Sequence, residues 1–356
     1  MADDREVLAG WWREFAEQQC RGYSPLYEAI CEEVAGNRDV LDLVLEAPMP
    51  GRQPNVLLAA VHFLLLGGLD HPLADTYAGA GNGPPAGPAF CELVGSHRAE
   101  IADLLATRRT NTNECGRSAV LVPGLRWIAD RFGEPLALLD AGTSAGLTLN
   151  LDRYLLDYGG GLTTGPPEST LRIVCEVTGP APIDNTAPVI AARIGLDRSP
   201  VDLSDPEEAR WMLACVWPDT GRLERTAAAI DLALAHPQEL VTGDLIDDLA
   251  TTAHRLPADA PLCVVTSWAM AYVPGRDRPR FVEELRHLGR QRPVAWLHAE
   301  GPGVVRGMPA PTRPSTRVGI EPSLLGCLVI DGASEEHQLL GRCHPHGAWL
   351  EWLASR

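Results

Sequence analysis

The stretch LALLDAGTSAG (residues 136–146) constrains the fold most strongly, because it joins a short apolar strand to a turn that contains two glycines. Only leucine and alanine fill residues 136–139, and so short an apolar run, bounded by Pro135 and the glycines, is typical of a buried strand. Asp140 closes the run. The stretch therefore predicts a buried strand whose carboxyl end enters a glycine turn.

The pattern of apolar residues changes at this strand. Residues 3–135 carry apolar side chains at helical spacing, and Ser24, Asn37 and Pro54 stand where helices are expected to begin. After residue 135, segments typical of strands and helices alternate, which predicts a parallel sheet. We expect strands at 136–140, 171–177, 188–200, 239–244, 261–273 and 292–301, and an antiparallel pair within 324–352. Helices are expected at 144–158, 245–254 and 279–290, together with a helical stretch at 206–235 that is broken at WPDTGR (residues 217–222).

These patterns predict an α/β protein of two domains, since 356 residues are many for one hydrophobic core. We expect residues 1–134 to form a helical N-terminal domain. Residues 135–356 are expected to form a Rossmann-like sheet with a mixed insertion at about 178–236 and a C-terminal antiparallel hairpin.

The charge of the chain narrows the range of partners. The formal net charge is −17, and an acidic surface repels phosphate backbones and anionic lipids, so we expect neither nucleic acid nor a membrane as partner. The longest apolar stretch, residues 56–69, is too short to span a bilayer. All 30 basic residues are arginines, which excludes a P-loop lysine, a Schiff-base lysine and a Ser–Lys dyad.

The cysteines indicate a reducing compartment. Nine cysteines are scattered along the chain without a C-x-x-C pair, a pattern typical of free thiols and not of disulfides or structural zinc. No apolar signal segment stands near residue 1. We therefore expect a cytoplasmic protein.

The glycine turn allows two interpretations. Residues 142–146, GTSAG, fit the G-x-S-x-G nucleophile elbow of serine hydrolases, in which Ser144 would attack a carbonyl. Counted from Asp140, the same letters fit a D-x-G-x-S-x-G turn that receives S-adenosylmethionine in methyltransferases. An elbow follows several strands of its sheet, whereas residues 136–140 form the first strand expected here. The sequence thus favours the cofactor turn, with the hydrolase as the alternative.

Further carboxylates stand where such a cofactor needs them. Gly142 and Gly146 would admit the methionine part of the cofactor, with Asp140 and Ser144 beside it. A carboxylate after the second strand would accept the ribose hydroxyls, and both Glu176 and Asp197 are candidates. Asp244, after the next strand, is the candidate for the adenine amino group, although an aspartate there can also cap a helix.

Four blocks of the sequence resemble a bacterial family known as domain of unknown function 2332. They are RRTNTNECGRSAVL, LLDAGTSAGLTLNLDRY, RIGLDRSPVDLSDPEEARWMLACVWPD and LCVVTSWAMAYV, and the resemblance extends over nearly the whole chain. It implies a methyltransferase-like fold for the C-terminal domain and assigns no chemistry.

Other polar and aromatic residues are candidates for the acceptor site. Candidate substrate-binding residues are Asn113, Glu114, Arg117, Trp217, Asp219, Ser267 and Trp268. Candidate catalytic residues are His298, Glu300 and Tyr272, with His298 the first choice for a base because its unperturbed pKa lies near neutrality. His344 and His346 lack a partner carboxylate in the sequence pattern, so we expect no metal site.

Together these features predict transfer of a methyl group from S-adenosylmethionine to an oxygen or nitrogen atom of a small molecule. A serine hydrolase using Ser144 is the first alternative, and a non-catalytic ligand-binding protein on a methyltransferase-like frame is the second. The sequence does not predict an oligomeric state.

Overall fold

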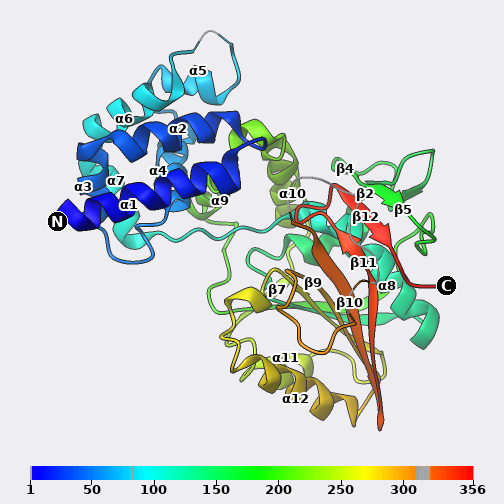
Figure 1. The fold of residues 1–356 in the computed structure, drawn as a ribbon. Helices are drawn as coiled ribbons and strands as arrows, with labels where there is room; N and C mark the ends of the chain where they lie inside the picture. Colours follow the sequence, from blue (N-terminus) through cyan, green and yellow to red (C-terminus); the bar gives the residue numbers. More distant parts are fainter. Residues whose placement is uncertain (1, 82, 310, 312–320, 356) are drawn as a thin grey trace. The chain divides into compact units, whose positions relative to one another are not determined.

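The chain folds into two compact units. The computed structural model describes residues 2–81, 83–309, 311 and 321–355. Unit 1 consists of Met1–Thr112 and Ser204–Ala227, and unit 2 of Asn113–Leu203 and Ala228–Arg356 (Figure 1).

Unit 1 is built from helices, as the apolar spacing predicts. The described elements are α1 (Ala2–Phe15), a π-helical turn (Ala16–Cys20), α2 (Pro25–Gly36), α3 (Arg38–Glu46), α4 (Pro54–Leu66), α5 (Leu73–Tyr77), α6 (Ala86–Ser96), α7 (Arg98–Thr107), α9 (Pro206–Ala214) and a 3-10 turn (Pro218–Thr220). The Ser24 side chain caps α2 by accepting from the Tyr27 N–H, and the Asn37 side chain caps α3. The expected helix starts at Ser24 and Asn37 are therefore confirmed, and α4 begins at Pro54 as expected.

Unit 2 contains the strands. It includes a 3-10 turn (Cys115–Arg117), α8 (Ser118–Phe132), β1 (Leu136–Ala141), a 3-10 segment (Leu147–Arg153), β2 (Leu155–Asp157), β3 (Thr163–Thr164), β4 (Arg172–Val174), β5 (Glu176–Thr178), β6 (Ile190–Asp197), β7 (Glu239–Thr242), α11 (Leu249–Ala253), β8 (Leu262–Ser267), a 3-10 turn (Met270–Tyr272), α12 (Arg278–Gly289), β9 (Val294–Glu300), β10 (Ser323–Asp331), β11 (Ser334–Cys343) and β12 (Trp349–Trp352). The chain passes from unit 1 to unit 2 within α10 (Leu223–Ala235).

The main sheet has nine strands in the order β5-β12-β11-β10-β9-β8-β1-β6-β7. Strands β7, β6, β1, β8 and β9 are parallel, while β10, β11 and β12 continue the sheet antiparallel. Numbered along the chain, the five parallel strands follow the order 3-2-1-4-5 of doubly wound folds. The predicted α/β class, with a parallel sheet and antiparallel C-terminal strands, is confirmed.

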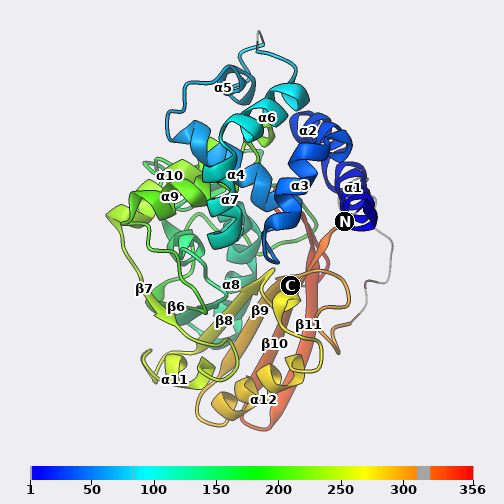
Figure 2. The ribbon, with the colours of Figure 1, turned by 90° about the vertical axis from the view of Figure 1, so that its left-hand side faces the viewer.

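Helices cover both faces of this sheet. Phe281 of α12 packs against Trp296 of β9, with ring centroids 5.0 Å apart. On the opposite face, Gly124 of α8 lies against the next residue of the strand, Leu297. Figure 2 shows α11 and α12 against the strands. Successive strand residues point to opposite faces of a sheet. Trp296 therefore marks the face that α12 covers, and Leu297 marks the face that α8 covers.

The prediction of a helix at residues 144–158 is wrong. Instead, a 3-10 segment covers Leu147–Arg153, and β2 begins at Leu155. Gly146 before the segment has a φ of 72°, and Asn150 inside it departs from helical geometry. Residues 147–151 are all buried, so they lack the polar face that a surface α-helix of an α/β protein exposes.

The strand expected at residues 171–177 is split between two sheets. β4 pairs with β2 in a separate three-stranded sheet, whereas β5 pairs with β12 at the far edge of the main sheet. The change occurs at Cys175, whose N–H donates to the Asp157 carbonyl, while the next N–H, of Glu176, donates to the Ala348 carbonyl. The strand that lies next to β1 in the main sheet is therefore β6, and not the segment at residues 171–177.

Candidate functional site

The candidate site lies at the carboxyl ends of β1 and β8. These strands are neighbours in the sheet. After β1 the chain forms β6 on one side of β1, and later it forms β8 on the other side of β1. The strand order therefore reverses between them. Open α/β sheets bind their ligands outside the carboxyl ends of the strands at such a reversal point.

Both loops at this point hold strained backbone. Ser144 has a φ of 53° and Trp268 a φ of 57°, and they are the two non-glycine residues with positive φ in the described part of the chain. Ser144 follows β1 and Trp268 follows β8. A bulky residue in this region of φ is a genuine outlier, and such strain concentrates at functional sites. The two outliers thus mark the reversal point.

The two loops also touch at Gly142, which has a φ of 88°. A Cβ atom at Gly142 would lie only 2.4 Å from the Cβ of Ala269. The Gly142 N–H donates to the Leu196 carbonyl over 2.8 Å. This glycine is therefore required for packing between the loops, whether or not a ligand binds there.

Asp140 is a buried carboxylate at the end of β1, with 4% of its surface exposed. Its Oδ2 accepts from the Thr143 hydroxyl at 3.1 Å and also from the Thr148 hydroxyl. Burial raises the pKa of Asp140 to about 6, while the two hydroxyls oppose that rise and the nearby charge of Asp197 adds to it. The hydrogen bonds of Thr143 and Thr148 to Asp140 were not predicted from the sequence, although the two residues follow Asp140 by only three and eight positions.

Asp197 ends β6, the strand next to β1. Its Oδ2 accepts from the Ser144 N–H at 2.9 Å, and its Oδ1 accepts from the Ser199 N–H at 2.9 Å. Asp197 therefore holds the glycine turn from the neighbouring strand. The structure brings together Asp140, Gly142, Ser144, Gly146 and Asp197 from the predicted set.

Two other predicted cofactor residues lie elsewhere in the sheet. Glu176 is on β5, at the edge opposite to β7, so it is not brought to the β1 loop. Asp244 follows β7, but its Oδ1 accepts from the Ile246 and Asp247 N–H groups, and its Oδ2 accepts from Arg198. The side chain of Asp244 thus caps a turn, the alternative that the sequence left open.

Glu300 ends β9 and faces the loop after β8. It is 1% exposed, and its Oε1 accepts from the Ala269 and Met270 N–H groups at 3.0 and 3.1 Å. Its Oε2 is buried without a hydrogen-bond partner among the described residues. Burial raises the pKa of Glu300, and the two N–H groups partly offset that rise.

Arg117 links its own segment to the end of β8 and to the loop after β11, at the carboxyl ends of the parallel strands. Its Nε donates to the Pro345 carbonyl at 2.8 Å, and its Nη1 donates to the carbonyl and the hydroxyl of Ser267 at 2.9 and 3.1 Å. Its charge also lowers the pKa values of Asp140 and Glu300. Arg117 therefore ties the chain before α8 to the end of β8 and to the loop after β11, and its charge offsets only a small part of the rise that burial causes in the two pKa values.

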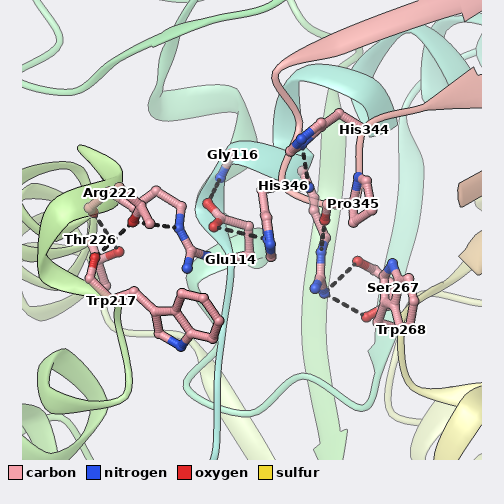
Figure 3. Close-up of polar contacts among 12 residues, drawn as sticks. Glu114, Gly116, Trp217, Arg222, Thr226, Ser267, Trp268, His344, Pro345 and His346 are labelled. Atoms are coloured by element: carbon pink, nitrogen blue, oxygen red, sulfur yellow. Dashed lines mark hydrogen bonds and ion pairs between the residues drawn. The ribbon is translucent and has the colours of Figure 1, made fainter. Parts of the chain in front are cut away.

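The other residues of the predicted TNTNECGR group fix the chain around Arg117. The Asn113 side chain accepts from the Leu147 N–H at 2.6 Å, directly after the glycine turn. Glu114 Oε1 accepts from the Gly116 N–H, and its Oε2 lies 3.6 Å from His346 Nδ1 (Figure 3). Asn113 is thus part of the support of the turn.

The remaining catalytic candidates are differently placed. Tyr272 is 84% exposed. His298 is fully buried on β9, its Nε2 lies 3.0 Å from His337 Nε2, and burial lowers its pKa well below the ordinary value. The Trp268 indole N–H donates to Ser323 Oγ at 2.8 Å. The His298 ring is engaged by His337 of β11, whereas Glu300 hydrogen-bonds to the loop after β8, which favours Glu300 over His298 as the base.

Trp217 and Asp219 belong to unit 1, where packing accounts for both. The Trp217 ring lies 5.2 Å from the Tyr27 ring. Asp219 accepts from the Ser24 hydroxyl at 2.6 Å and from the Leu26 N–H at 3.0 Å, at the start of α2. These contacts, which join residues almost 200 positions apart, were not readable from local sequence.

The described residues contain neither a cluster suited to a metal ion nor a helix suited to a membrane. No group of three or more histidine, cysteine, aspartate or glutamate side chains there could hold a metal ion. No helix in the same residues is long and apolar enough to cross a membrane.

Comparison with known proteins identifies the family. No curated protein and no solved structure matches the chain. A family model does match: residues 9–352 fit the family described as an uncharacterized protein conserved in bacteria (DUF2332). The match covers nearly the whole sequence, and the chain therefore belongs to the DUF2332 family.

Proposed function

We propose that unit 2 binds S-adenosylmethionine at the carboxyl ends of β1, β6 and β8 and transfers its methyl group to a small molecule. The observation that carries this proposal is the pair Asp140 and Asp197. Their carboxylates end two adjacent strands and flank a turn in which Gly142, Ser144 and Gly146 all have positive φ. Positive φ at such a turn allows the backbone to approach a ligand closely.

The charge at the turn favours this cofactor over a dinucleotide. S-adenosylmethionine carries a sulfonium and an ammonium group against one carboxylate, so buried carboxylates suit it. A pyrophosphate needs a helix N-terminus or free cations. Here a 3-10 segment, Leu147–Arg153, follows the turn in place of an α-helix, and Arg198 is paired with Asp244.

Asp197 is the residue proposed to hold the ribose hydroxyls. It stands on the strand next to β1, and each carboxylate oxygen has lone pairs beyond the one that accepts from Ser144 or Ser199. Glu176, the other candidate, lies on β5 at the distant edge. The geometry thus favours Asp197 between the two.

Glu300 replaces His298 as the proposed proton acceptor. The bound cofactor would supply an electrophilic methyl group, and the protein would position the acceptor for in-line attack and exclude water. The buried Oε2 of Glu300 lacks a hydrogen-bond partner among the described residues. Burial raises the pKa of Glu300, which makes it a stronger base than an exposed carboxylate.

A serine hydrolase is the second candidate, and the positive φ of Ser144 favours it, since nucleophile elbows are strained in this way. An elbow serine, however, stands at the start of an α-helix, whereas the segment after Ser144 is a 3-10 turn. The Ser144 N–H is also held by Asp197. We therefore rank the hydrolase second.

A variant pair tests the proposal. Asp197→Asn should weaken binding of S-adenosylmethionine about tenfold or more, because hydrogen bonds to a charged group contribute roughly 1.5–3 kcal/mol. Asp331→Asn, an exposed aspartate on β10, is the matched control and should bind as the wild type does. Affinities come from titration calorimetry. Equal affinities of Asp197→Asn and the control would show that Asp197 does not contact the cofactor. Binding of S-adenosylmethionine without methylation of any acceptor would favour the non-catalytic binding protein.

A further inference from the structure

Two buried polar atoms without partners lie on the same face of β9. They are Nδ1 of His298 and Oε2 of Glu300, and neither has a hydrogen-bond partner among the described residues. Both side chains are at least 99% buried. Positions 298 and 300 are two apart, so their side chains point to one face of the sheet.

A third side chain shows that the two groups approach each other. Thr266 of β8 stands beside His298 in the parallel register and is fully buried. Its hydroxyl accepts from the Trp296 indole N–H at 3.0 Å, and the Thr266 side chain lies near enough to the Glu300 carboxyl to oppose the rise that burial causes in the pKa of Glu300. The Glu300 carboxyl and the His298 ring therefore both lie beside Thr266 on this face of the sheet.

His298 also connects to the protein surface. Its Nε2 lies 3.0 Å from Nε2 of His337, a half-buried residue of β11. The contact passes over β10 at Gly326, where a Cβ atom would lie 2.5 Å from His298 Cε1 and 2.8 Å from its Nε2. The missing side chain of Gly326 is what allows the two rings to meet across the intervening strand.

Hydrogen bonding between the two rings does not satisfy His298. If its Nε2 carries the proton, Nδ1 is a buried acceptor without a donor. If its Nε2 accepts, Nδ1–H is a buried donor without an acceptor. Either tautomer leaves an unsatisfied group that costs about 1–3 kcal/mol. One water molecule can serve as donor to one of the two orphaned atoms and acceptor from the other.

We propose that Glu300, one buried water molecule, His298 and His337 form a proton path from the carboxyl end of the sheet to the surface. A proton taken up at Glu300 Oε2 passes to the water, which gives its own proton to His298 Nδ1. His298 releases the proton on Nε2 to His337 Nε2, and His337 loses one from Nδ1 to solvent. One proton enters and one leaves, and both imidazoles change tautomer.

Other charged groups act on the two ends of this path. Arg117 lowers the pKa of Glu300. Burial lowers the pKa of His337, and the charge of Glu335 opposes that shift; Glu335 is itself paired with Arg286 of α12 at 2.7 Å. The catalytic use of the path rests on the proposed function, in which Glu300 receives the proton of the acceptor. The path itself exists in the protein without any ligand.

Nuclear magnetic resonance of ¹⁵N-histidine-labelled protein, free of ligand, tests the path. In the wild type, His298 Nδ1 should shift with the titration of Glu300. Glu300→Gln should abolish that inflection, whereas the control Glu335→Gln should preserve it and lower only the midpoint of His337. A wild-type His298 Nδ1 that does not follow Glu300, or an inflection kept in Glu300→Gln, would overturn the proposal.

A crystal structure provides a second test that needs no variant. It should show one water within about 3.2 Å of both His298 Nδ1 and Glu300 Oε2. A dry contact there would also overturn the proposal. Because neither experiment contains S-adenosylmethionine, failure of the path is distinguishable from failure of cofactor binding.

Discussion

The Ser144 N–H donates to Asp197 Oδ2 over 2.9 Å and so ties the loop after β1 to the end of β6. Ser144 is held with a φ of 53° at this contact. The hydrogen bond to a charged acceptor is of the stronger kind, and it helps to offset a backbone strain of order 1–3 kcal/mol. The candidate site is therefore held in its shape by the protein alone, before any ligand arrives.

The close approach of Gly142 and Ala269 predicts a specific loss of stability. Gly142→Ala should destabilise unit 2 by about 1–3 kcal/mol more than Gly133→Ala, because overpacking adds to the backbone strain. Gly133 is the matched control, since its φ is 87° and a Cβ atom there would meet nothing within 4 Å. Urea unfolding measures both variants. Equal losses, or no rescue of Gly142→Ala by Ala269→Gly, would contradict the contact.

The raised pKa of Asp140 predicts a pH-dependent penalty. Folding favours the protonated form, so the stability that Asp140 contributes is present below the ordinary pKa of 3.8 and is lost as pH rises toward about 6. The stability of the wild type relative to Asp140→Asn should therefore fall by about 3 kcal/mol between pH 3.5 and pH 7. Unfolding curves at several pH values measure it, and a constant difference would show that Asp140 titrates normally.

The choice between cofactor turn and nucleophile elbow predicts the behaviour of Ser144. A fluorophosphonate probe should leave the protein unlabelled, and Ser144→Ala should behave identically. Intact-protein mass spectrometry reads the outcome. Stoichiometric labelling that disappears in Ser144→Ala would establish the hydrolase instead, because loss of a catalytic serine removes many orders of magnitude of rate.

Asp219 is predicted to stabilise unit 1 as a cap of α2. Asp219→Ala removes the acceptor of the Ser24 hydroxyl and the Leu26 N–H and should destabilise the unit by roughly 1–2 kcal/mol. The exposed Asp103 on α7 is the control, and Asp103→Ala should change stability by less than about 0.5 kcal/mol. Thermal unfolding distinguishes the two, and equal midpoints would argue against the cap.

Local sequence was sufficient for elements that are set by local patterns. β1 could be predicted because Leu136–Leu139 are uniformly apolar and buried on both faces. The caps at Ser24 and Asn37 follow from side-chain chemistry within three residues. Asp140 was predictable for the same reason, as the polar residue that ends a buried strand.

The rest depended on partners that are distant in sequence. Glu176 begins β5 and Asp197 ends β6, and only the pairing of β5 with β12 and of β6 with β1 shows that the two residues lie far apart in the sheet. The burial of His298 depends on Gly326 and His337, which lie on two later strands. No periodicity of the β9 segment contains that information.

Titration calorimetry of the wild type with S-adenosylmethionine, S-adenosylhomocysteine and NAD tests the central claim most directly. The two sulfur compounds should bind with measurable heat at one site per chain, and NAD should give none, because no α-helix follows the glycine turn to receive its pyrophosphate. Absence of heat from both sulfur compounds at millimolar concentration, or saturable binding of NAD, would contradict the account.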